Sequence, residues 1–399
     1  MKASLISPAQ DVAWPGWPDD EPQLDHDKRP ILVEKTKSMA RLYRAERQWV
    51  KIQPWLQSQG YLLRPRFRPG WVPSWQGNKK VDLDYCEDAI EHTNSGAEVA
   101  IDAVRISDGR HVCLKRVPGR AEDSTEVAIT KYLSQDEQRK DPRNHAIPLL
   151  DLIQAPDHCF MVLPFCRNLM YHTPPFGTVG EAFDMVEQAL EGLEYLHEMR
   201  IAHRDISIAN VMMVADRIFP RGFHMDSDDQ DAHGRELSGL RSRTRVGGVK
   251  YYIIDFGESM RFGPNDSILI DVWSKAGIHA PETLEPGRPP YDAFKTDIYA
   301  MGSSLRYLTV QDYRPYFDLL SPLFDAMTVE DPSRRPTASA ALEQFRVIKR
   351  TYSRTALHSR IRINRPGYGS QPENLVQRGF RDTWHWTKQC IFAVLNFKW

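Results

Sequence analysis

Several features that define common protein classes are missing from this sequence. Its 399 residues contain five cysteines, and no two of them form a CxxC pair. An odd number of scattered thiols excludes a disulfide framework and a zinc site, and indicates a reducing compartment. The first residues lack the apolar core of a signal peptide, and no apolar run approaches the roughly 18 residues of a membrane helix. We therefore expect a soluble protein of the cytoplasm or nucleus, without a membrane span.

An excess of one charge is also missing. The 52 basic and 53 acidic side chains give a net charge of -1 at pH 7. This balance provides no bulk electrostatic reason to expect nucleic acid or a membrane as the partner. No internal repeat is present. The length exceeds what one small core requires and suits a two-lobed domain with extensions.

Three zones differ in composition. Residues 1–83 hold six of the ten tryptophans among many prolines, which predicts an extension that packs on a folded domain rather than a disordered tail. Within it, apolar residues from Met39 to Val50 fit one face of a helix that should end before Pro54. Residues 84–350 follow as the predicted domain.

Residues 351–399 form a tail that is first basic and then aromatic. Six Lys or Arg and no acid lie between Lys349 and Arg365. This pattern is typical of a solvated linker, and an anionic partner is the alternative. The apolar end, CIFAVLNFKW, is too short to span a bilayer, so we expect it to pack on the body of the protein.

Strand patterns give way to helical patterns within the predicted domain. HVCLKRV (111–117) and CFMVLPF (159–165) indicate strands, and STEVAITKYLS (124–134) indicates a helix. Thr178 and Glu181 form a capping box ahead of a further amphipathic helix. A β-rich half followed by an α-rich half predicts an α+β fold with two lobes and a cleft between them.

A set of polar residues in this domain suits one kind of chemistry. Transfer of a γ-phosphoryl group needs a cation on the phosphates, a clamp for that cation, oxygen ligands for Mg²⁺, and a carboxylate beside the attacking hydroxyl. Each part has a candidate: Lys115 ending VCLK, Glu126 on the next helix, Asp205 in HRD, Asn210 five residues later, and Asp255 opening DFG. One three-residue match alone is weak, because it arises by chance. The ordered set is specific.

Together with APE (280–282) and DPSRRPT (331–337), these motifs resemble the eukaryotic protein kinase superfamily over residues 84–350. The resemblance implies ATP and Mg²⁺ as cofactors. It implies that Lys115 holds the phosphates and pairs with Glu126. The remaining roles that it implies are the catalytic carboxylate for Asp205 and the magnesium ligands for Asn210 and Asp255.

The resemblance also implies supporting roles. Arg335 buries an ion pair with Glu282, and Asp297 braces the backbone of the catalytic loop. The nucleotide is then flanked by the gatekeeper Leu163, by Phe165 in the hinge, and by Gly96 near the expected phosphate-covering loop. Arg204 of the HRD motif is positioned to read a phosphate on Ser259, Ser267 or Ser274, although ordinary loop serines are the simpler interpretation.

Three departures from the family pattern bear on activity. Ser207 stands where serine/threonine kinases place a Lys, and Gly277, Ile278 and His279 stand where they place the Thr that meets it. These two losses concern one contact. Losing one preorganised charge costs about 3 kcal/mol of transition-state stabilisation, which slows transfer without abolishing it. Third, Gly96 is alone where three glycines would let backbone N–H groups approach the phosphates.

A polar stretch at 215–248 separates two predicted strands that need only a short turn. It predicts a surface excursion that serves as a lid or a docking element. Its acidic run DSDDQD (226–231) lacks the central Gly and the final Glu of an EF-hand loop, so we expect a solvated loop. The insertion and neighbouring phrases such as NHAIPLLDLI are similar to kinase-domain proteins of mushroom-forming fungi.

The first hypothesis is an ATP-dependent protein kinase that phosphorylates an unidentified protein substrate, on Ser or Thr rather than Tyr. The second is a pseudokinase scaffold that binds nucleotide weakly or not at all. The third, a small-molecule kinase of the aminoglycoside type, shares the HxD and later Asp but would lack APE and the DPxxRP segment.

Overall fold

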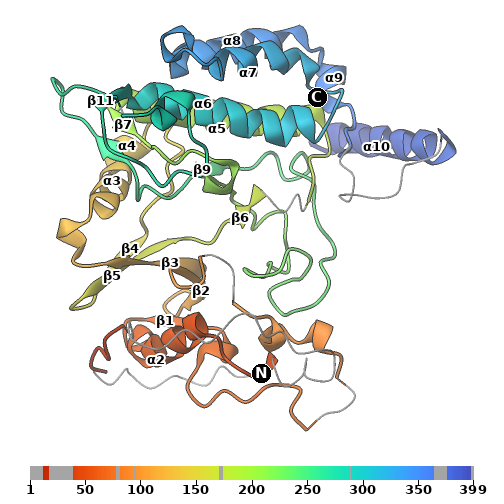
Figure 1. The fold of residues 1–399 in the computed structure, drawn as a ribbon. Helices are drawn as coiled ribbons and strands as arrows, with labels where there is room; N and C mark the ends of the chain where they lie inside the picture. Colours follow the sequence, from red (N-terminus) through yellow and green to blue (C-terminus); the bar gives the residue numbers. More distant parts are fainter. Residues whose placement is uncertain are drawn as a thin grey trace. The chain divides into compact units, whose positions relative to one another are not determined.

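The computed structural model describes residues 12–17, 39–77, 81–92, 96–169, 174–287, 289–363 and 375–396 (Figure 1). They form two compact units. The first unit draws on residues up to 131, on 148–167 and on 219–239; the second draws on 132–147, 168–218 and the residues from 240 onward. Within the described ranges, no helix is both long enough and apolar enough to cross a membrane.

The first unit is built on an antiparallel sheet of five strands in the order β1-β2-β3-β5-β4. The strands predicted at 111–117 and 159–165 are confirmed as β3 and β5. The strand bounds are β1 (Tyr61–Leu63), β2 (Ala100–Arg105), β3 (His111–Pro118), β4 (Asp151–Gln154) and β5 (His158–Pro164). Every residue of β5 is buried, as its continuous apolar sequence indicates.

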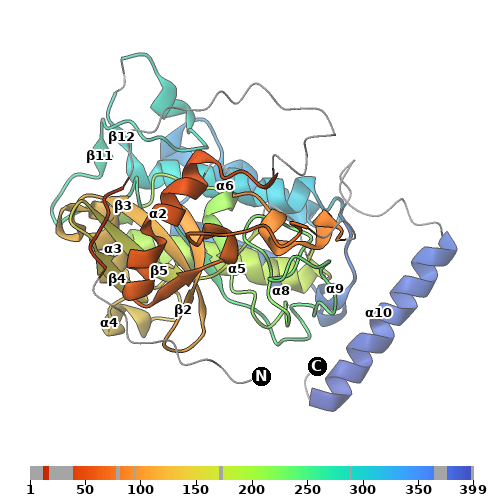
Figure 2. The same ribbon diagram turned by 90° about the horizontal axis from the view of Figure 1, so that it is seen from below.

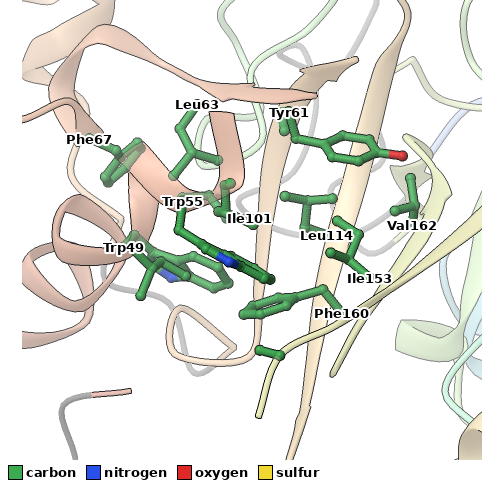
Figure 3. Close-up of a cluster of buried hydrophobic side chains, with 14 of the residues drawn as sticks. Trp49, Trp55, Tyr61, Leu63, Phe67, Ile101, Leu114, Ile153, Phe160 and Val162 are labelled. Carbon is green, nitrogen blue, oxygen red and sulfur yellow. The ribbon is translucent and has the colours of Figure 1, made fainter. Parts of the chain in front are cut away.

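The tryptophan-rich extension forms part of this unit. Its strand β1 is the edge strand beside β2, and its helix α2 (Arg44–Ser58) packs on β1. Trp49, Trp55 and Phe160 belong to one buried cluster (Figure 3). Because the sheet is completed by the extension, the compact units do not follow the compositional zones.

The helix that we predicted to end before Pro54 continues to Ser58, so this prediction was wrong. A proline inside a helix removes one backbone hydrogen bond and costs about 3 kcal/mol. Trp55 and Leu56, which follow it, are buried in the core, and burying a large apolar side chain contributes about 1.5–3 kcal/mol. Packing on the sheet therefore outweighs the local preference of the proline.

The acidic run at 226–231 is only partly the solvated loop that we predicted, because Asp228 and Asp229 are exposed but the other two aspartates are not. The side chains of Asp226 and Asp231 are buried. Asp226 accepts hydrogen bonds from Arg64 (2.7 Å) and from His92 (2.7 Å), both in the first unit. A buried carboxylate needs such partners because its desolvation is costly, and residues this distant in sequence leave no local signal of the pairing.

The second unit is mainly helical. The helix predicted after Thr178 is confirmed as α5, and the Thr178 hydroxyl accepts a hydrogen bond from the Glu181 N–H (3.1 Å). In the packing, α8 lies against α5 and α7 lies against α6. The helices of this unit are α4 (Asp136–Arg139), α5 (Val179–Glu198), α6 (Ala293–Arg306), α7 (Ser321–Met327), α8 (Ala338–Thr351), α9 (Arg354–His358) and α10 (Leu375–Asn396).

Short strand pairs complete the second unit. β8 pairs with β9, β7 pairs with β10, and β11 pairs with β12, all antiparallel. Their bounds are β7 (Ile201–Ala202), β8 (Val211–Met213), β9 (Tyr251–Ile253), β10 (Met260–Arg261), β11 (Leu269–Ile270) and β12 (Tyr291–Asp292). Two of the boundaries between the units fall within α3 (Thr125–Leu133) and at β6 (Arg167–Asn168). The helix α3 confirms the one predicted there. A sheet-based unit and a helical unit confirm the predicted α+β class.

We expected the apolar end of the tail to pack on the body; its residues 397–399 lie outside the described residues, and the side chains described at 390, 391 and 394 do not pack in this way. Cys390, Ile391 and Val394 belong to α10 (Figure 2), and all three are exposed. The exposed large apolar side chains of this helix repeat along one face, whereas Asp382 and His385, which contact Arg360 and His358 of the same unit, are polar. Length alone, from which we argued, does not determine which face of a helix is covered.

Candidate functional site

Two of the predicted site residues meet within the first unit. Lys115 lies on β3, where it pairs in register with Met161 of β5, and Glu126 is the second residue of α3. The Lys115 ammonium forms an ion pair with Oε1 of Glu126, and both side chains are largely sheltered from water. The helix therefore orients the lysine side chain, as the family resemblance implies.

The predicted nucleotide-contacting residues also lie in this unit. Leu163 is buried on β5. The Phe165 ring stacks on Phe223 of the insertion, with centroids 4.5 Å apart and an interplanar angle of 12°. The insertion thus contacts the predicted hinge directly. We had no sequence signal for this contact, because the two rings are separated by 58 positions in the chain.

Gly96 occupies a turn that leads into β2. Its carbonyl accepts hydrogen bonds from the backbone N–H groups of Val99 (2.8 Å) and Ala100 (2.9 Å). The neighbouring Ala97 carbonyl accepts a buried hydrogen bond from the Trp49 indole (2.7 Å). Strand β1 ends at Leu63 and β2 begins at Ala100, so Gly96 lies at the end of a long connection between them. Through Trp49, helix α2 holds this end of the connection, where the family pattern would have further glycines.

The second unit brings Asp205 and Asn210 together. The Asn210 side-chain amide donates to the Asp205 carbonyl (2.8 Å) and to its Oδ2 (3.0 Å). The other carboxylate oxygen, Oδ1, accepts a hydrogen bond from the backbone N–H of Gly277 (3.0 Å). Asp205 is therefore oriented from both sides. The donor at Gly277 was not predicted, and it comes from the segment whose expected Thr is missing.

Burial affects the protonation of this carboxylate. Partial burial raises the pKa of Asp205 above its ordinary value, and the charge of Asp255 raises it further. The hydrogen bonds from Gly277 and Asn210 and the nearby His203 act in the opposite direction, because they stabilise the ionised form. The net direction is upward, which suits a carboxylate that must accept a proton.

Backbone hydrogen bonds connect this loop to Asp255. The Ile254 N–H donates to the Asn210 carbonyl (2.9 Å), and the His203 ring contacts the Ile254 carbonyl (2.9 Å). Asp255 has a φ of +66°, and its Oδ1 accepts from the Gly257 N–H (3.2 Å). A non-glycine residue in this region is strained and needs such surrounding support. These bonds fix Asp255 just after β9, next to Ile254, whose N–H contacts Asn210.

The predicted brace of the catalytic loop is confirmed. Both oxygens of the buried Asp297 carboxylate accept backbone hydrogen bonds, from His203 (2.8 Å) and from Arg204 (2.7 Å). The predicted ion pair between Arg335 and Glu282 is also confirmed, as a bidentate contact of 2.6 and 2.7 Å. Both pairs are long-range, and each joins a buried carboxylate to donors that lie far away in the sequence.

Arg204 holds the segment between DFG and APE through backbone groups. Its guanidinium donates to the carbonyls of Glu258 (3.0 Å) and Val272 (2.7 Å). The Ser259 and Ser274 hydroxyls are buried and donate to carbonyls of the catalytic loop. Among the three serines, Ser267 alone is exposed. These contacts fix the segment to the catalytic loop through backbone carbonyls.

The oxygen atoms of Asn210 and Asp255 fit the ligand chemistry of Mg²⁺, a hard cation that prefers carboxylate and carbonyl oxygens. Because the Asn210 NH₂ group is engaged with Asp205, its amide oxygen is directed away from that carboxylate. Among the residues that the structure describes, no cluster of three or more His, Cys, Asp or Glu has the arrangement of a resident metal site.

Comparison with known proteins agrees with this geometry. A family model described as "Protein kinase domain" matches residues 95–319, more than half of the chain. The chain therefore belongs to the protein kinase domain family.

Two curated relatives illustrate the similarity. One is the serine/threonine-protein kinase pakG of Dictyostelium discoideum, 23% identical over 270 residues that cover 66% of this chain and 22% of the relative. The other is the serine/threonine-protein kinase PLK1 of Xenopus laevis, 24% identical over 205 residues that cover 50% of this chain and 32% of the relative. The chain thus spans less than a third of the length of each.

Proposed function

We propose that this chain is an active protein kinase that transfers the γ-phosphoryl group of ATP to a serine or threonine hydroxyl of a protein. The observation that carries the proposal is the orientation of Asp205, which Asn210 holds from one side and the Gly277 N–H from the other. A carboxylate fixed in this way can orient a hydroxyl and accept its proton. The names of the two relatives favour Ser/Thr over Tyr.

The other residues have complementary roles in the proposal. Lys115, oriented by Glu126, neutralises phosphate oxygens, and Leu163 and Phe165 border the nucleotide. Bound Mg²⁺ would neutralise charge that develops on the phosphates, and Asn210 and Asp255 would hold it. The convergence of Lys115 with Asp205 and Asp255 around one nucleotide stays a prediction. The narrower likeness to proteins of mushroom-forming fungi stays a prediction as well.

The test is label transfer from ATP in the presence of Mg²⁺, with the wild-type chain, Asp205→Asn and Asp255→Asn compared side by side. We expect transfer to the chain itself or to a generic protein substrate, and loss of transfer in both variants. A matched control is Asp228→Asn, an exposed carboxylate of the insertion, which should transfer as well as wild type. ATP binding, measured by thermal shift, should weaken in Asp255→Asn and persist in Asp205→Asn.

Two results would contradict the proposal. A thermal shift with ATP but no label transfer, under conditions where a known kinase is active, would identify a pseudokinase. Ser207 and the single glycine of the phosphate-covering loop are the residues that favour this alternative. Label on a sugar or amine and on no protein would instead indicate a small-molecule kinase.

A further inference from the structure

The last described helix, α10, carries an apolar stripe that the rest of the described chain does not cover. Val376, Phe380, Trp384, Ile391 and Val394 are between 53% and 82% exposed. At 100° per residue they fall within roughly 80° of arc along the whole helix. Isolated exposed apolar residues are ordinary, but a stripe of this length, interrupted by the exposed Thr387, marks an interaction surface.

The opposite face of α10 holds the helix to its unit. Asp382 accepts a hydrogen bond from Arg360 (3.0 Å), and His385 contacts the His358 carbonyl (2.8 Å). Both residues lie roughly 140–200° around the helix axis from the middle of the stripe. The polar face is thus engaged within the protein, and the apolar stripe is directed outward.

The segment of sequence that carries this helix differs sharply in charge from the average of the chain. Residues 349–399 contain ten Lys or Arg and two acids, a net charge of +8, although the whole chain carries -1. On α10 itself, Arg381 and Lys388 border the stripe, and the Lys388 ammonium lies 5.1 Å from the Trp384 ring centroid. An aromatic and aliphatic stripe with cations beside it is complementary to a surface whose outer layer is anionic and whose interior is apolar.

We propose that α10 lies in the surface of an anionic lipid bilayer, with the stripe among the acyl chains and Arg381 and Lys388 at the headgroups. The polar face, which contains Asp382, His385 and Arg378, excludes a spanning orientation. The stripe extends over roughly 27 Å at 1.5 Å per residue. A helix bound in a protein groove is typically anchored over about two turns, so the length favours a planar surface.

The experiment uses the full chain and vesicles that contain either phosphatidylcholine alone or roughly one third phosphatidylserine. We expect cosedimentation with the anionic vesicles, about tenfold weaker binding to neutral ones, and release at high salt. Phe380→Ala combined with Trp384→Ala should weaken binding about tenfold or more, because both aromatic anchors are lost. Arg381→Glu combined with Lys388→Glu should abolish the preference for phosphatidylserine.

Gln389→Ala, on the polar face of the same helix, is the matched control and should bind like wild type. All variants should keep the melting temperature and the label transfer of wild type, because α10 contains no proposed site residue. The proposal is overturned if the wild type does not sediment with anionic vesicles, or if the aromatic double variant binds them equally well. A dimer that the aromatic variant loses, without vesicle binding by wild type, would identify a second copy as the occupant.

Discussion

Asp205 shows how a backbone group can replace a missing side chain. The sequence has Ser207 in place of the usual Lys and no Thr ahead of APE, which removes one side-chain contact. In the structure the Gly277 N–H donates to Asp205 instead. A backbone donor is independent of side-chain chemistry, so no motif reveals it. The carboxylate is therefore oriented by a donor that the family motifs do not include.

Gly277→Pro should lower kcat for label transfer about tenfold or more, whereas Gly277→Ala should stay close to wild type. Proline removes the N–H, and a hydrogen bond to a charged group contributes about 1.5–3 kcal/mol. The measurement is steady-state kinetics of both variants, and we expect the two to bind the nucleotide with equal affinity. Equal kcat for the proline and alanine variants would show that this donor does not orient Asp205.

The same residue sets the pH dependence of transfer. Burial raises the pKa of Asp205 above its ordinary value, and the ionised form is the one that accepts a proton. We expect kcat to fall as the pH decreases through this raised pKa, above the value near 4 of a free aspartate. Because the Gly277 donor lowers the pKa, Gly277→Pro should move the acidic limb of the profile to higher pH.

Among the elements, α2 depends most clearly on a buried ion pair. Arg66 and Glu46 are completely buried and form bonds of 2.6 and 2.9 Å. Arg66 also donates to three carbonyls, while Glu46 accepts from the backbone N–H groups of Tyr43 and His92. The pair fixes the start of α2 to the loop that follows β1, and each charge would be uncompensated without the other.

Arg66→Met should lower the free energy of unfolding by about 3–5 kcal/mol, because it leaves the Glu46 carboxylate buried without its partner. Urea unfolding followed by tryptophan fluorescence is a suitable measurement, since α2 carries Trp49 and Trp55. Lys51→Met, at an exposed position of the same helix, should change stability by no more than about 0.5 kcal/mol. A similar small change for Arg66→Met would refute a structural role of the pair.

The segment between DFG and APE is ordered by Arg204 and by buried serines, which predicts activity without phosphorylation. Ser267→Ala should transfer label within about twofold of wild type, since its side chain is exposed. Ser274→Glu should lose transfer about tenfold or more, because it places a charge where the Ser274 hydroxyl donates to the Arg204 carbonyl. Loss of activity in Ser267→Ala, or after phosphatase treatment, would contradict this expectation.

At the scale of the molecule, residues 219–239 of the insertion belong to the sheet-based unit, whereas the two ends of the insertion belong to the helical one. Arg64 connects residues 219–239 to the sheet, with bonds to Asp226 (2.7 Å), Asp102 (2.9 Å) and Glu87 (3.0 Å). Although burial alone would raise the pKa of Asp226, its hydrogen bond with His92 and the charge of Arg64 hold it below the ordinary value. Residues 219–239 are thus an integral part of the sheet-based unit.

Asp226→Asn should lower the free energy of unfolding at neutral pH by about 1.5–3 kcal/mol, the contribution of a hydrogen bond between charged groups. Because the folded-state pKa is depressed, this contribution is complete above about pH 4 and is lost as the pH falls through the folded-state value. The difference between wild type and variant should therefore shrink in acid. Thermal unfolding at several pH values, with Asp228→Asn as an unchanged control, measures it. A constant difference would contradict the linkage.

The sequence by itself determined the chemistry and the local structure. The residues Lys115, Glu126, Asp205, Asn210 and Asp255 could be singled out because phosphoryl transfer needs those groups in that order. The helix after Thr178 and the strands around Lys115 could be predicted because hydrophobic period and caps are local signals. The family resemblance implied the ion pair between Arg335 and Glu282. It also implied that Asp297 braces the backbone of the catalytic loop.

Only the tertiary structure decided which distant groups meet. Arg64 and Asp226 are 162 positions apart, and Gly277 is 72 positions from Asp205, so no periodicity or motif relates them. The same holds for Pro54, which remains helical because Trp55 and Leu56 gain burial on the sheet, and for α10, whose polar face proved to be the attached one. Local preferences are small compared with the free energy of long-range burial and charge pairing, and those terms exist only once the chain has folded.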